Sequence, residues 1–141
     1  MSKLTRWDAP FADKFLPSVT LVTSSHGSVT VIVADAIDKY PKYQVSFDRV
    51  IAFTCMEEMH SPRDFADVNI PEGKVCAFIW EDSPWLSSYE QGVHFVEEGN
   101  PVPLFHYLIF GGDNNVEIIT ASKPTVSVVN EKTLIAVHYQ I

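Results

Sequence analysis

The stretch LFHYLIF-GGDNN-VEIIT, residues 104–120, decides the fold. Two runs rich in aromatic and β-branched residues flank five residues of the types that turn a chain most readily. This pattern predicts a β-hairpin with strands at residues 104–110 and 116–120. If Phe110 faces Val116, the register places His106 opposite Thr120 and Ile109 opposite Glu117.

Further strands are predicted on both sides of this hairpin. Residues 19–23 and 28–34 form a second hairpin, because Gly27 between them can take the positive φ that a tight turn requires. Residues 43–47 alternate and residues 50–56 continue apolar, so the two runs form either one bulged strand or a tight hairpin at Asp48 and Arg49. The remaining predicted strands are residues 75–80, 125–129 and 133–139.

Helices are predicted to be short. Asp8, Ser61 and Ser83 each stand shortly before a proline, where a capping side chain and a first-turn proline fit together. With 141 residues the chain is expected to be a single domain, residues 1–141. About eight strands with one to three short helices indicate a mainly β fold, an antiparallel barrel or sandwich.

Composition narrows the function classes. The chain is 46% hydrophobic, which excludes a disordered protein. Its formal charge of −8 and pI near 4.9 would repel a phosphate backbone, so nucleic acid is a poor candidate partner. No apolar run has the length of a signal-peptide core or a membrane helix, so we expect a soluble, cytoplasmic protein without a membrane partner. Cys55 and Cys76 fall in apolar strands and are expected to be buried thiols, although neighbouring strands would also permit a bridge.

Charge is distributed unevenly along the chain. Residues 75–122 contain no Lys or Arg but seven acids, and this segment is also rich in aromatic residues. Acids interleaved with aromatic rings can attract a basic protein and then anchor it. The expected partner-binding residues are Glu81, Asp82, Trp85, Glu90, Glu97, Glu98, Asp113 and Glu117. Trp80 lies in a predicted strand and is expected in the core. The alternative to a partner surface is that the acids serve solubility and are scattered over several faces.

Catalytic motifs are not apparent. Neither cysteine stands at a glycine-rich turn or helix start, and the Gly111-Gly112 pair lacks phosphate-loop spacing, so we predict no catalytic residue and no cofactor. A single Glu-x-x-His run at residues 57–60 in a loop does not predict a metal site. An alternative remains: a small-molecule-binding barrel or hydrolase whose pocket is formed by Glu58, His106, Tyr107 and His138.

A set of residues resembles a recurring small-domain pattern in uncharacterised bacterial proteins. It comprises Tyr43-x-Val45-x-Phe47, Ala52-Phe53, Glu58, Ser83-Pro84-Trp85-Leu86, His106-Tyr107-Leu108-Ile109, Asp113, Glu117-Ile118-Ile119 and Lys123-Pro124. Some proteins with this pattern are thought to be immunity proteins of polymorphic toxin systems. The resemblance implies an immunity-like inhibitor and assigns no catalytic residue. The acidic segment and the absence of a catalytic motif add the expectation that the protein is non-enzymatic and captures a basic protein. Exposed strand edges would also allow two copies to pair as a homodimer.

Overall fold

The computed structural model describes residues 2–25, 27–57, 68–90, 96–97 and 99–130. The protein is mainly β, as the sequence predicted, with one short helix in the described part of the chain. The elements are β1 (Ser2–Arg6), β2 (Ser18–Ser25), β3 (Ser28–Ala34), β4 (Lys42–Phe47), β5 (Val50–Glu57), β6 (Val68–Asn69), β7 (Ala77–Trp80), α1 (Pro84–Glu90), β8 (Val96–Glu97), β9 (Asn100–Pro101), β10 (Phe105–Phe110), β11 (Asn114–Thr120) and β12 (Thr125–Val129).

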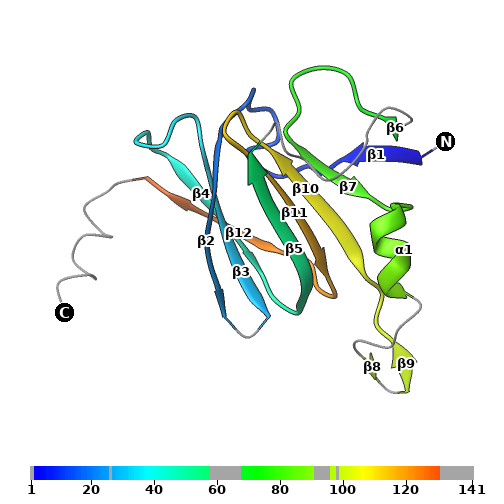
Figure 1. The fold of residues 1–141 in the computed structure, drawn as a ribbon. Helices are drawn as coiled ribbons and strands as arrows, with labels where there is room; N and C mark the ends of the chain where they lie inside the picture. Colours follow the sequence, from blue (N-terminus) through cyan, green and yellow to red (C-terminus); the bar gives the residue numbers. More distant parts are fainter. Residues whose placement is uncertain (1, 26, 58–67, 91–95, 98, 131–141) are drawn as a thin grey trace, which may run out of the picture.

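Two sheets form a sandwich-like fold, and the described strands do not close into a barrel (Figure 1). The larger sheet has six strands in the order β5-β11-β10-β7-β1-β6, and the smaller has four in the order β12-β4-β3-β2. All pairs are antiparallel except β1 with β6. The sequence did not predict β1, whose Lys3 and Arg6 interrupt the apolar pattern. The small β8–β9 ribbon stands apart from both sheets.

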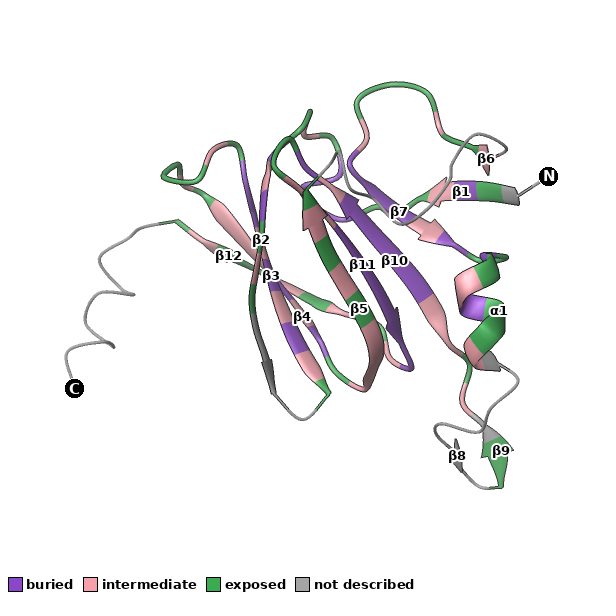
Figure 2. Cartoon of the chain, in the orientation of Figure 1, coloured by how far each residue is buried: buried purple, intermediate pink, exposed green. Residues whose placement is uncertain are grey.

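The main core lies between the two sheets. Alternate residues of β3 and β4, among them Val31 and Phe47, point toward Tyr107 and Ile118 of the larger sheet, and all four are buried. This is the consequence of period-2 alternation, which gives each strand one face for the core. Figure 2 shows the buried residues concentrated in β7, β10 and β11, the central strands of the larger sheet.

Both predicted hairpins are present, with one correction to the register. Gly27 has a φ of 82° in the β2–β3 turn, as predicted. In the β10–β11 hairpin, however, Phe110 is paired with Asn115 rather than Val116, so that His106 is opposite Ile119 and Leu108 is opposite Glu117. The strand begins at Asn114, two residues earlier than predicted. This shift by one residue reverses the face to which every side chain of β11 points relative to β10.

Residues 48 and 49 carry the chain from one sheet to the other. β4 pairs with β3 and β12, whereas β5 pairs with β11, so neither the bulged strand nor the tight hairpin predicted at Asp48 and Arg49 is correct. Arg49 adopts a φ of 53° at this corner. The hydroxyl of Thr120 donates a hydrogen bond of 2.6 Å to the carbonyl of Asp48, which ties the corner to the end of β11.

The face of the larger sheet that points away from the smaller sheet carries α1, and we call it the outer face. It presents Leu4, Phe78, Trp80 and Leu108, which form a second apolar cluster. Of the three predicted helix starts, only Ser83 begins a helix in the described residues; Asp8 precedes turns, and Ser61 lies outside the described residues. Within the described chain, no helix combines the length and hydropathy needed to cross a lipid bilayer.

The two cysteines do not form a disulfide. Cys76 is buried, as predicted, and its thiol donates to the carbonyl of Phe11 at 3.3 Å. Cys55 is exposed, which contradicts the prediction that both thiols are buried. The reason is that β5 is an edge strand, so its apolar sequence does not have a neighbour on each side.

Candidate functional site

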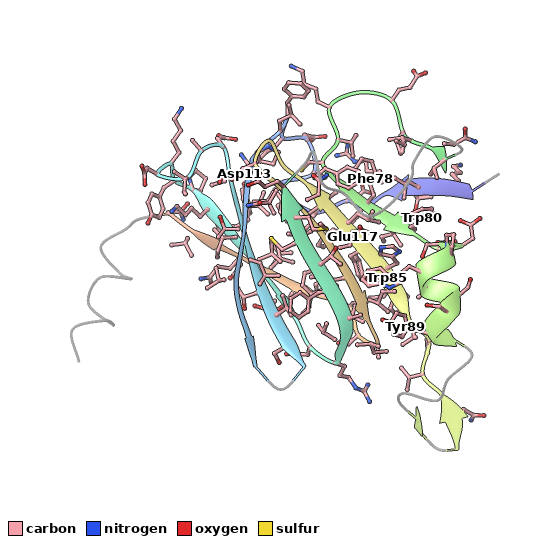
Figure 3. The ribbon with its side chains drawn as sticks, in the orientation of Figure 1. Phe78, Trp80, Trp85, Tyr89, Asp113 and Glu117 are labelled. Atoms are coloured by element: carbon pink, nitrogen blue, oxygen red, sulfur yellow. The ribbon has the colours of Figure 1, made fainter. Side chains whose placement is uncertain are left out.

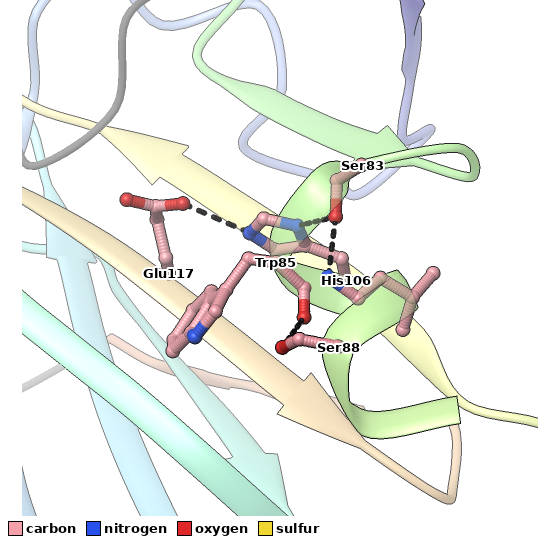
Figure 4. Close-up of polar contacts among 6 residues, drawn as sticks. Ser83, Trp85, Ser88, His106 and Glu117 are labelled. Carbon is pink, nitrogen blue, oxygen red and sulfur yellow. Dashed lines mark hydrogen bonds and ion pairs between the residues drawn. The ribbon is translucent and has the colours of Figure 1, made fainter. Parts of the chain in front are cut away.

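A polar network is buried on the outer face, where α1 begins. His106 on β10 lies between Ser83, which precedes α1, and Glu117 on β11 (Figure 4). Its Nδ1 is 2.7 Å from Ser83 Oγ, and its Nε2 is 2.9 Å from Glu117 Oε1. Ser83 and His106 are 0% exposed and Glu117 is 2% exposed. Such complete burial of three polar groups is sustained only when they bond to one another.

The donors and acceptors of this network can be assigned in one consistent chain. Ser83 is the N-cap of α1, and its Oγ accepts the backbone N–H of Leu86 at 2.9 Å. With that lone pair used, the Ser83 hydroxyl can donate its proton to Nδ1 of His106. The imidazole then carries its own proton on Nε2 and donates it to Glu117. The network therefore joins the cap of α1 to two central strands of the sheet.

Aromatic rings enclose the imidazole. The Trp80 ring is stacked on His106 with a centroid separation of 5.6 Å, and the Trp85 ring meets it edge-on at 5.3 Å. Trp80 is 2% exposed, as predicted for a core residue. Trp85 and Tyr89 also contact each other edge-on at 6.0 Å on α1. The imidazole thus lies within an aromatic cage formed by β7 and α1.

The order serine, histidine, carboxylate is that of a hydrolase relay, but the setting differs. A nucleophilic hydroxyl must reach a substrate carbonyl, whereas Ser83 is fully buried and its oxygen is engaged as a helix cap. The hollow beside Trp85 described below is not lined by Ser83, His106 or Glu117. What this arrangement can do is orient α1 on the sheet.

The residues of the alternative pocket do not come together as predicted. Tyr107 follows His106 on β10 and therefore points to the opposite face, into the core between the sheets. There its ring contacts Trp7 at 5.0 Å and Phe47 at 5.6 Å, and burial raises the pKa of its phenol. A pocket that combines His106 with Tyr107 is therefore wrong. Glu58 and His138 lie outside the described residues.

The acids of residues 75–122 do not share one face. Glu81 and Asp82 are exposed in the turn before α1, whereas Glu117 is buried in the network and cannot contact a partner from there. Glu90 ends α1, and Glu97 lies in β8. Glu98 lies outside the described residues. Of the predicted partner-binding residues, Glu81, Asp82 and Trp85 therefore lie together around the start of α1.

Asp113 lies at the far end of the larger sheet from α1, as Figure 3 shows. The strand from His106 to Phe110 alone covers about 13 Å. The carboxylate of Asp113 accepts hydrogen bonds from the backbone N–H of Val19 at 2.9 Å and from the hydroxyl of Ser18 at 3.0 Å. It also accepts the N–H of Asn114 at 2.8 Å. Asp113 thus joins the β10–β11 turn to β2 and is separate from the surface around α1.

Trp85 and Tyr89 line a hollow that the sequence did not predict. It has a volume of about 380 Å³, and its other walls come from Gly27, Val29 and residues 50–53. Helical spacing of four residues places the two rings on the same side of α1. The sequence signal available in advance was this aromatic pair directly after the Ser83 cap. We call the group formed by Glu81, Asp82, Trp85 and Tyr89 the α1 corner.

Comparison with protein-family models, with curated proteins and with solved structures gave no match.

Proposed function

We propose that the protein is a non-enzymatic binding module that captures a basic protein through the α1 corner. The observation that carries this proposal is that two exposed carboxylates, Glu81 and Asp82, stand in the turn before the helix whose Trp85 and Tyr89 line the hollow. An arginine of the partner suits such a site, because its guanidinium stacks on aromatic rings and pairs with carboxylates.

Anchoring of α1 supports the same function. The Ser83 cap is bonded to His106, and His106 to Glu117, so the start of the helix is fixed to the central strands of the sheet. A rigid contact surface loses less conformational freedom on binding, which leaves more of the contact energy for affinity. The buried network is, in this proposal, the support of the binding surface.

The negative charge of the protein assists the encounter with a basic partner. The sequence from residue 75 to residue 122 contains no Lys or Arg, so the α1 corner has no basic neighbour along the chain. Complementary charge accelerates association, and this gain declines as salt shortens the screening length to about 8 Å at physiological ionic strength. We therefore expect affinity for the partner to fall as salt is raised.

A pull-down from the native host, followed by affinity measurement with the purified basic protein that it retains, tests the proposal. Glu81→Lys with Asp82→Lys should weaken binding at least tenfold at low salt, and Tyr89→Ala should weaken it at low and high salt alike, because the ring contributes contact rather than steering. Circular dichroism should show that the variants remain folded.

The matched control reverses the charge of two acidic residues outside the α1 corner. Asp38 and Glu72 are both exposed and lie outside the α1 corner, so Asp38→Lys with Glu72→Lys changes the net charge equally. This variant should lower the association rate modestly and leave the dissociation rate unchanged. Equal loss of affinity in the two double variants would show that net charge alone, and not the α1 corner, holds the partner.

For the biological role we propose inhibition of a toxin, in line with the resemblance of residues 43–124 to immunity proteins. Co-expression offers a direct assay: a basic toxin encoded beside this gene should be tolerated by cells that express the protein. The Glu81→Lys, Asp82→Lys variant should fail to protect, whereas the Asp38→Lys, Glu72→Lys variant should protect. Binding without protection would support the proposed binding function and contradict the proposed inhibition of a toxin.

A further inference from the structure

A second hollow lies toward the other end of the outer face. It is bounded by Phe78 of β7 and Phe110 of β10, by Phe15 and Leu16, and by the loop that begins at Ile70, and its volume is about 350 Å³. Figure 3 places Phe78 on β7, away from Trp85 and Tyr89. This hollow shares no lining residue with the one beside Trp85. It is therefore a separate feature from the α1 corner.

Large apolar side chains stand exposed at its mouth. Phe15 is 68% exposed, Leu16 is 48% exposed and Ile70 is 46% exposed. Leu16 moreover has a φ of 46°, a left-handed conformation that is unfavourable for a non-glycine residue. The neighbouring backbone packs tightly against the β10–β11 turn and so restrains Leu16. The carbonyl of Pro17 accepts the N–H of Gly112, and Gly111 lies so close to the same carbonyl that a Cβ there would come within 2.6 Å of it. The fold thus holds an apolar mouth open to solvent.

One polar side chain that lines the hollow has an amide oxygen without a partner among the described residues. The amide oxygen of Asn115 is enclosed, and it accepts no hydrogen bond in the part of the chain that the structure describes. An enclosed polar atom without a hydrogen-bond partner is unfavourable. Asn115 shares the outer face with Phe110, its cross-strand partner. Because Asn115 lines the hollow, a rotation of its side chain would present the amide to a ligand that brings a hydrogen-bonding group.

The size and charge of the hollow restrict the ligand. Small-molecule sites occupy about 300–1,000 Å³ and are mostly apolar with a few placed polar groups, and this hollow falls at the low end of that range. An α-helix, about 10 Å wide with its side chains, would not enter it. Exposed Glu72 and Lys74 flank Gly73 of the lining, and the ammonium of Lys74 lies 5.9 Å from the ring centre of Phe15, so charges of both signs stand near the mouth. An uncharged small molecule suits these conditions.

We propose that this hollow binds a small, uncharged aromatic or alicyclic alcohol, with its hydroxyl on Asn115. A hydroxyl both donates and accepts, so it can bond to either the oxygen or the nitrogen of the amide once the side chain has rotated toward the hollow. The apolar body packs between Phe78, Phe110 and Leu16. This site does not depend on the proposed function of the α1 corner.

Three probes of matched shape test the proposal by NMR titration of the full chain. In 2-naphthol a hydroxyl stands where 2-methylnaphthalene has a methyl group and 2-naphthoate has a carboxylate. We expect 2-naphthol to shift the backbone amide signals of Val75, Gly111 and Asn115, and to bind about five- to tenfold more tightly than 2-methylnaphthalene, the ratio that one net hydrogen bond gives. The carboxylate should bind more weakly than the alcohol.

Variants locate the site. Asn115→Leu should abolish the preference for the hydroxyl while retaining 2-methylnaphthalene, and Phe15→Ala should weaken both probes by removing one wall. Asn130→Leu, an exposed asparagine at the end of β12, serves as the control and should change neither. Equal affinity for alcohol and hydrocarbon in the native protein, tighter binding of the carboxylate, or shifts confined to other residues would each overturn the proposal.

Discussion

His106 and Glu117 share one face of the larger sheet, with 2.9 Å between Nε2 and Oε1, because Leu108 is the residue directly opposite Glu117. Had Ile109 been opposite, the two side chains would point to different faces of the sheet. The contact therefore depends on the β10–β11 register, and the register depends on a turn that ends at Asn114. Removal of either side chain takes one buried hydrogen bond from the other.

We predict that Glu117→Gln lowers the free energy of unfolding by about 1–3 kcal/mol. The amide retains the shape of the side chain and one acceptor oxygen, but the charge-assisted bond to His106 becomes a neutral one. Urea unfolding followed by tryptophan fluorescence measures the change, since Trp80 and Trp85 both contact the imidazole. Glu72→Gln, at an exposed site, should stay within about 0.5 kcal/mol. An equal effect of both changes would rule out a special role for the buried carboxylate.

Ser83→Ala should lower the free energy of unfolding by about 1–2 kcal/mol, because the Leu86 N–H loses its cap and His106 loses a bonded neighbour. Ser88→Ala is the matched control: its hydroxyl donates to the carbonyl of Trp85 at an exposed site, and we expect almost no change. In the double variant Ser83→Ala, Glu117→Gln, the losses should not add, because both act on one imidazole. Strict additivity would mean that Ser83 and Glu117 are energetically independent.

Most of the predicted strands are present because strand formation depends on local chemistry, although β1 was not predicted and the predicted strand at residues 133–139 lies outside the described residues. Gly27 takes the positive φ that the β2–β3 turn requires, and the apolar runs at β10 and β11 are strands. The change of sheet at Asp48 and Arg49 could not be predicted, because alternation indicates a strand without indicating which strand will pair with it.

The candidate site was predicted less well for the same reason. Glu117 looked like a surface residue because it is charged, yet its neighbours Val116, Ile118 and Ile119 indicate a strand that is buried on both faces. Ser83 was correctly expected to cap a helix, but its bond to His106 spans 23 residues and follows from the tertiary fold. Long-range pairing, and not local preference, assembles this network.

Asp113→Ala should destabilise the protein by about 2 kcal/mol and leave affinity at the α1 corner unchanged. The carboxylate accepts hydrogen bonds from Val19, Asn114 and Ser18, so its removal leaves backbone donors without acceptors and loosens the link between β2 and the β10–β11 turn. Thermal unfolding and the partner-binding assay together check this. Asp113→Asn should lose less stability, since one side-chain oxygen can still accept. Weaker partner binding in a folded Asp113 variant would return this residue to the contact surface.

The two thiols should differ in reactivity. Burial raises the pKa of the Cys76 thiol to about 11, whereas Cys55 is exposed on β5. Because the thiolate is the reactive form, iodoacetamide at pH 8 should label Cys55 and spare Cys76 in the folded protein. Mass spectrometry of tryptic peptides reads out both sites, and Cys55→Ser should abolish labelling of the native chain. Rapid labelling of Cys76 before unfolding would contradict its burial.

The same pKa shift makes stability depend on pH. An unfolded thiol loses its proton near pH 9, but folded Cys76 keeps it to about pH 11. Between these values the unfolded state binds fewer protons than the folded state. The contribution of Cys76 to the unfolding free energy is therefore complete below pH 9 and falls by about 1.4 kcal/mol per pH unit above it. Other groups titrate in this range, among them Tyr107, so the measurement is the difference between the native protein and Cys76→Ala. That difference should shrink steadily from pH 9 to pH 11, and a difference independent of pH would show that Cys76 ionises alike in the folded and unfolded chain.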